Sequence, residues 1–155
     1  MRITYFIITL AICFCMSLHA ENKANDYMKQ AQNSLEQKDF TKARYLYLQA
    51  YKAFSNEGDY TQAIDCGTKA TYLYYRENYY QEAFELCRQM TQFLLTEEQK
   101  AQKTFYDQRF QLTKERLQMY IKLKNAAQAQ LQLNTLDNLV SQAGSEKLAE
   151  DFLYT

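Results

Sequence analysis

The sequence contains no proline, no tryptophan, three glycines and a single histidine among its 155 residues. A chain with so few turn-forming residues has few positions at which it can bend, which favours long helices joined by short polar loops. Folds built from β-hairpins need a turn about every 8 to 12 residues. Because Gly58, Gly67 and Gly144 cannot supply that many turns, we predict an all-α fold.

An excess of charge of one sign is also missing, since 18 basic residues balance 18 acidic ones. A basic stripe or a lysine–arginine cluster is the electrostatic footprint of nucleic-acid binding. The sequence has neither, so we expect no direct nucleic-acid binding by this segment.

Residues for catalysis are equally sparse. The single histidine, His19, lies near the N-terminus, and histidine is the commonest general base and metal ligand. No phosphate-binding glycine motif occurs, and Cys66 and Cys87 lack both a histidine partner and a CxxC arrangement. Glu82 and Glu85 fall outside the apolar face of their expected helix. We therefore predict no enzyme activity, no catalytic residues, no metal site and no cofactor.

The first twenty residues have the composition of a secretory signal peptide. Arg2 precedes an apolar stretch without charge, and Ala20 offers a small residue before a cleavage point, after which the chain becomes polar. The apolar run is short for a membrane span, which needs about 20 residues. We predict a cleaved signal peptide at 1–20 and a mature domain at 21–155, from which cleavage also removes His19.

Two alternatives to cleavage remain open at this point. One is an uncleaved membrane anchor, and the other is a lipoprotein modified at Cys13, although bulky Ile12 precedes that cysteine. In each case the segment implies export, to the periplasm or cell envelope of a Gram-negative bacterium.

Aromatic and small residues recur with helical spacing along the rest of the chain. Intervals of 3, 4, 3 and 4 residues place each series on one face of a helix, and each series follows the last by twenty residues. The series are Phe40, Ala43, Tyr47, Ala50 and Phe54; Tyr60, Ala63, Gly67, Ala70 and Tyr74; and Tyr80, Ala83, Cys87, Met90 and Leu94. A helix hairpin with one apolar face cannot bury it alone, so the hairpins should stack.

We predict helices at 23–37, 41–55, 60–76, 80–95, 97–123 and 126–142, forming hairpins at about 23–55, 60–95 and 97–142, with an incomplete fourth from 145. Asp39 and Asp59 suit N-caps, and Thr96-Glu97-Glu98-Gln99 has the form of a capping box that would open the 97–123 helix. Gly144 suits a C-terminal cap and Ser145 the next N-cap. The expected core faces of the last two helices are Tyr106, Phe110, Leu117 and Tyr120, and Ala129, Leu133, Leu136 and Val140.

The segment Lys38-Asp39-Phe40-Thr41-Lys42-Ala43 resembles the turn and second helix of a tetratricopeptide repeat; Asn78 to Ala83 resembles the same feature, and Asn125 to Ala129 is a weaker copy. The resemblance covers roughly 24–142 and implies a right-handed α-α superhelix of stacked hairpins. The matching alanines are 40 and 46 residues apart, whereas the usual period is about 34. Elongated tetratricopeptide-like hairpins are therefore expected, with a generic α-solenoid as the alternative.

The same resemblance implies that the first helix of each pair lines a concave surface where a protein or peptide binds. The residues it places there are Thr68, Tyr72, Tyr75 and Arg76, followed by Lys114, Gln118, Ile121 and Lys122. Tyrosine and arginine are enriched among residues that dominate binding energy. The alternative is that Tyr72 and Tyr75 pack against the neighbouring hairpin.

Cys66 and Cys87 fall on consecutive helices at heights that differ by about 4–5 Å when counted from the turn near Asn78. A disulfide between them is therefore allowed in an oxidising compartment. The alternative is that each cysteine packs as a small buried hydrophobe, because each falls at or beside a core position.

The final run, Ser145 to Thr155, begins an amphipathic helix and lacks the polar capping helix that solenoids need. Three hypotheses follow: a protein-binding module of the envelope, self-assembly through this open C-terminal helix, or the N-terminal part of a longer protein. For the third, the features resemble the exported sensory regions of bacterial regulators that carry a transmembrane helix and a cytoplasmic LuxR-type helix-turn-helix.

Overall fold

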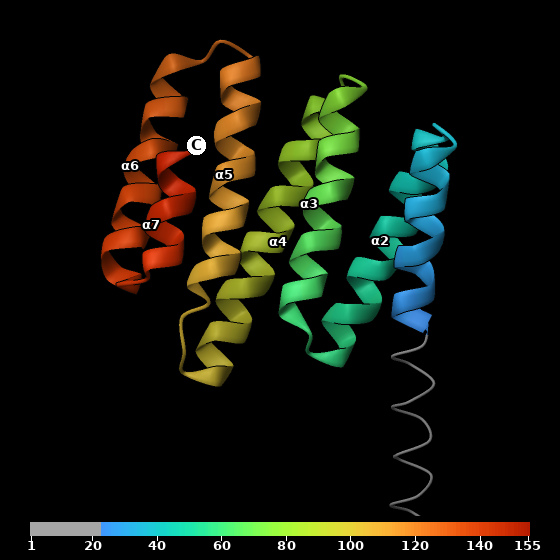
Figure 1. Ribbon diagram of the computed structural model, residues 1–155, viewed down its shortest axis with the longest axis horizontal. Coiled ribbons are helices and arrows are strands. Elements are labelled where there is room, and N and C mark those ends of the chain that lie inside the picture. Colours follow the sequence, from blue (N-terminus) through green and yellow to red (C-terminus); the bar gives the residue numbers. More distant parts are fainter. Residues whose placement is uncertain (1–22) are drawn as a thin grey trace, which may run out of the picture. The chain divides into compact units, whose positions relative to one another are not determined.

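The computed structural model describes residues 23–155, and these residues form helices and turns without a strand, as predicted. The predicted signal peptide at 1–20 lies outside the described residues. The chain divides into two compact units after Cys66, so that α3 begins in the first unit and ends in the second. The helices are one at 23–36, then α2 (Phe40–Glu57), α3 (Tyr60–Arg76), α4 (Tyr80–Ala101), α5 (Tyr106–Lys122), α6 (Ala126–Ala143) and α7 (Glu146–Leu153) (Figure 1).

One turn geometry recurs between the helices. A residue with positive φ ends the helix, and the backbone N–H of the next residue donates to the carbonyl five positions earlier. The donors are Asp39, Asp59, Tyr79 and Asn125, with N···O distances of 2.9–3.0 Å. Asp39 and Asp59 also act as the predicted N-caps, each accepting from a backbone N–H at 3.0 Å. Because the first three donors are twenty residues apart, the sequence repeat is a repeat of local structure.

The predicted apolar series form the cores of α2, α3 and α4. Ala43, Tyr47, Ala50 and Phe54 are buried, as are their counterparts in the next two helices apart from the opening aromatics and the half-buried Tyr74. Burial extends beyond these series to further positions, among them Leu46, Ile64, Leu73 and Leu86. The buried stripe on these helices is therefore wider than a single 3–4 series.

The C-terminal part of the second unit packs around a cluster drawn from α5, α6 and α7. Its buried members are Phe110, Leu117, Ala129, Leu136 and Leu148. The other residues predicted for the α5 and α6 core faces are partly buried and pack against this cluster, as does Phe152 of α7. Gly144 and Ser145 cap the adjoining helix ends as predicted, with the Ser145 hydroxyl accepting from Leu148 N at 3.4 Å.

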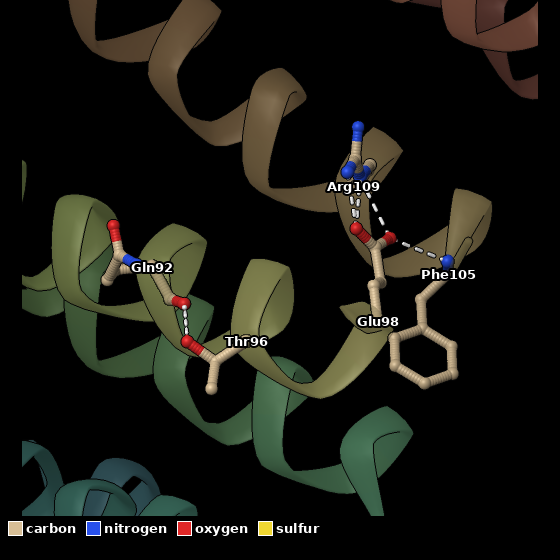
Figure 2. Close-up of polar contacts among 5 residues, drawn as sticks. All are labelled: Gln92, Thr96, Glu98, Phe105 and Arg109. Atoms are coloured by element: carbon tan, nitrogen blue, oxygen red, sulfur yellow. Dashed lines mark hydrogen bonds and ion pairs between the residues drawn. The ribbon is translucent and has the colours of Figure 1, made fainter. Parts of the chain in front are cut away.

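The predicted helix at 97–123 is wrong at its start. α4 continues to Ala101 and ends at Gln102, which adopts a left-handed conformation. α5 begins only at Tyr106. Thr96 is no N-cap, because its hydroxyl donates within α4 to the Gln92 carbonyl at 3.0 Å (Figure 2). Nothing in the sequence between Tyr80 and Ala101 interrupts a helix, since no glycine or proline occurs there.

Glu98 instead organises the turn that follows. Its carboxylate accepts from Phe105 N at 2.7 Å and from Arg109 Nε at 2.8 and 3.0 Å, and it also pairs with Arg109 Nη2 (Figure 2). Glu98 therefore caps the start of α5 from the last turn of α4, and it leaves little of its side chain exposed. The carboxylate predicted to open one helix thus joins two.

The turn between α5 and α6 offers a test of this backbone geometry. Lys124 has φ 56°, almost the value at Gly144, φ 58°, and a side chain in this region costs about 1–2 kcal/mol. We expect Lys124→Gly to raise the free energy of unfolding by about 1 kcal/mol and Gly144→Ala, whose added Cβ meets no atom within 4 Å, to lower it by about 1 kcal/mol. Urea unfolding measures both, and unchanged midpoints would contradict the expectation.

Candidate protein-binding face

Two side-chain bridges bring α3 and α5 together within the second unit. The Gln111 side-chain amide donates to Thr68 Oγ1 at 3.0 Å, and Lys122 Nζ donates to the Tyr75 carbonyl at 2.9 Å. Residue numbers rise together in the two bridges, so the helices run parallel, as first helices of successive hairpins would. The two stripes predicted from the sequence therefore lie beside each other.

The rings of Tyr75 and Tyr80 lie near Lys122, and Tyr72 contacts the Tyr75 ring; we call these four residues the tyrosine–lysine cluster. The Tyr72 and Tyr75 rings meet edge to face, with centroids 5.2 Å apart at 87°. The Lys122 ammonium lies 4.8 Å from the Tyr75 ring centroid and 5.7 Å from that of Tyr80, within the range of a cation–π contact. These contacts favour one arrangement of the Tyr72, Tyr75 and Lys122 side chains.

The eight residues predicted to bind a partner differ in how accessible they are. Tyr72 is 44% exposed and Ile121 is 56% exposed, and Arg76, Gln118 and Lys122 are also exposed. Tyr75 and Lys114 are partly buried. Thr68 is only 4% exposed and accepts the Gln111 bond, so it joins the helices and presents no surface of its own.

Sequence reasoning missed Glu115, whose charge acts on Tyr75 of this face. Burial raises the pKa of Glu115 to about 7, and the positive charge of Lys114 opposes this shift. Its Oε2 atom is buried and accepts no hydrogen bond from any described residue. Burial, and then the charges of Glu115 and Tyr72, raise the pKa of Tyr75. The spacing of Gln111, Glu115, Gln118 and Lys122, 4, 3 and 4 residues, is the signal that could have found this residue.

Cys66 and Cys87 are both buried free thiols. The Cys87 Sγ lies 3.9 Å from the Thr71 hydroxyl, and burial raises the pKa of its thiol to about 12, which leaves it unreactive at neutral pH. The alternative that these cysteines pack as small hydrophobes agrees with this placement. The Cys66–Cys87 disulfide stays a prediction for an oxidised form.

Outside this face, a metal site, a membrane-spanning helix or paired carboxylates would be the signs of a further function in residues 23–155. Residues 23–155 contain no group of three or more His, Cys, Asp or Glu side chains that could hold a metal ion. None of the helices in this range is both long and apolar enough to cross a membrane. Glu82 and Glu85 are exposed, and Glu85 pairs with Arg88 on the surface.

Comparison with family models, with curated proteins and with solved structures finds no match for the chain. The resemblance to tetratricopeptide repeats and to exported sensory regions therefore depends on the residues quoted above.

Proposed function

We propose that this protein is an exported, non-catalytic helical-repeat module that binds a protein or peptide in the cell envelope, with hairpins stacked as a tetratricopeptide-like right-handed superhelix. The tyrosine–lysine cluster, formed by residues of the parallel helices α3 and α5 and by Tyr80 at the start of α4, is the observation that carries the proposal. The signal-like segment at 1–20 supports export. Self-association through α7 and a sensory role in a longer membrane-spanning regulator are the competing hypotheses.

The cluster has the properties of a binding hot spot. Tyr72 presents a large ring whose edge-to-face contact with Tyr75 fixes it, so little side-chain entropy is lost when a partner covers it. Exposed Ile121 adds apolar area on α5, and Arg76 and Lys122 add positive charge. A segment with an apolar or aromatic anchor and an acidic neighbour fits this chemistry.

The test is selection of peptides from a random library displayed on phage, with the purified chain as bait. We expect Tyr72→Ala combined with Tyr75→Ala to lower the affinity for the selected peptides at least tenfold, which is about 1.4 kcal/mol of binding free energy. The single variant Tyr72→Ala should lose a large part of this affinity with little effect on folding, because Tyr72 is the more exposed ring.

A matched control replaces two exposed tyrosines outside the face, Tyr45 and Tyr154, with alanine and should keep full affinity. Equal affinity of both double variants would refute the proposal. A melting temperature that collapses on Tyr72→Ala alone would instead show that the cluster serves packing.

A further inference from the structure

A separate cavity of about 250 Å³ lies between α4, α5 and α6 in the second unit. It is larger than the roughly 150 Å³ engineered cavity that binds benzene and smaller than the 300–1,000 Å³ typical of drug-sized ligands. Its size therefore suits a compact molecule with a single ring or a short chain. None of the residues of the tyrosine–lysine cluster lines it.

Apolar side chains from all three helices form much of its wall. Leu94 and Leu95 come from α4, Leu112 from α5 and Leu139 from α6. Leu95 is partly open to solvent, whereas the other three are buried. These four leucines give the cavity an apolar wall, which favours the apolar body of a ligand.

Arg116 supplies a polar group without a hydrogen-bond partner among the described residues. It lines the cavity from α5, and its Nε–H is buried without an acceptor among residues 23–155. A buried donor of a charged group that is left unsatisfied is costly. Arginine is also the side chain best shaped to bind a carboxylate. A ligand that carries a hydrogen-bond acceptor would therefore give the Arg116 Nε–H the partner that residues 23–155 do not provide.

The other polar groups of the cavity set the sign and size of the ligand charge. Arg109 also lines it, but Glu98 bonds two of its nitrogens, so the pair is neutral and Arg116 leaves a net charge of one. The hydroxyls of Thr91, Thr113 and Thr135 donate to carbonyls four residues earlier, which leaves them only as acceptors. One positive charge matches a singly charged anion better than a dianion.

We propose that this cavity binds a small monocarboxylate with an apolar body. The carboxylate accepts from the Arg116 guanidinium, and the ring or short chain lies among Leu94, Leu112 and Leu139. The proposal is independent of peptide binding at the tyrosine–lysine cluster, because the two sites share no residue.

Isothermal titration calorimetry of the purified chain with octanoate and with 3-phenylpropionate tests the proposal. At least one of the two acids should bind, and octanamide, which keeps the chain but lacks the charge, should bind at least tenfold more weakly. Arg116→Met should cost the acid at least tenfold in affinity. The matched control Arg88→Met removes an exposed guanidinium on α4 and should change nothing.

A second pair of variants keeps the test decisive if Arg116→Met fails to fold. Arg116→Lys retains the charge, and Leu95→Phe narrows the cavity at its most exposed leucine; Arg116→Lys should bind the acid and Leu95→Phe should bind it more weakly. Absence of binding to both acids, equal binding by Arg116→Met and wild type, or tighter binding of octyl phosphate than of octanoate would each overturn the proposal.

Discussion

Replacing Glu98 with alanine is expected to lower the free energy of unfolding by about 3 kcal/mol. Removing one partner of a buried ion pair costs about 3–5 kcal/mol because the other charge is left uncompensated. Arg109 keeps 37% of its side chain exposed, so solvent screening reduces that figure. Loss of the bond to Phe105 N, which resembles loss of an N-cap, adds about 1 kcal/mol. Urea unfolding followed by circular dichroism measures the change.

Two further variants separate this role from a general effect of losing a charge. Glu85→Ala removes a carboxylate from an exposed ion pair on the same helix and should leave the midpoint unchanged. Glu98→Leu combined with Arg109→Met replaces both charges with apolar groups and should recover much of the loss. If Glu98→Ala unfolds at the wild-type midpoint, Glu98 does not hold the α4–α5 turn.

One series of the positions buried in α2, α3 and α4 could be predicted because its signal is local. The 3–4 spacing of Ala43, Tyr47 and Ala50 places them on one face of a helix, and such a pattern is typical of a helix with one buried face. The caps at Asp39 and Asp59 are equally local, since each side chain reaches a backbone N–H three residues ahead. These features depend on neighbours within one turn of helix.

The α4–α5 turn could not be predicted for the opposite reason. Thr96 to Gln99 has the residue types of a capping box, yet the partners of Glu98 are Phe105 and Arg109, 7 and 11 residues away. A local motif carries no information about which distant donors a carboxylate will meet in the folded chain. The left-handed residue that ends α4 is Gln102, which has no special preference for that conformation.

The binding face was predicted in part. Sequence spacing places Tyr72 and Tyr75 in one stripe and Lys122 in another. The contact between Lys122 and Tyr75, which joins the two stripes, spans 47 residues. Sequence spacing shows which residues share a helix face, but the register between two helices depends on packing. For the same reason, the sequence pattern predicts neither the burial of Thr68 nor the lack of an acceptor for Arg116 Nε–H among residues 23–155.

Glu115 should make the protein less stable as pH rises from about 5 to 8. Its pKa is raised by burial from 4.5 to about 7 in the folded chain, so between these values the folded state holds a proton that the unfolded state releases. The stabilising contribution is therefore complete below pH 4.5 and is lost as pH rises through 7. At 1.36 kcal/mol per pKa unit, the loss is about 3 kcal/mol.

Glu115→Gln should remove this pH dependence, because the amide cannot ionise. At pH 8 the variant should be more stable than wild type by about 2 kcal/mol, once about 1 kcal/mol is deducted for the amide N–H groups that burial leaves unpaired. Urea unfolding at pH 5, 6.5 and 8 (about equal steps across the titration) gives both slopes. The control Glu82→Gln changes an exposed carboxylate and should keep the wild-type slope. A wild-type free energy of unfolding that is the same at both extremes would contradict this expectation, because it would show that burial does not raise the pKa of Glu115.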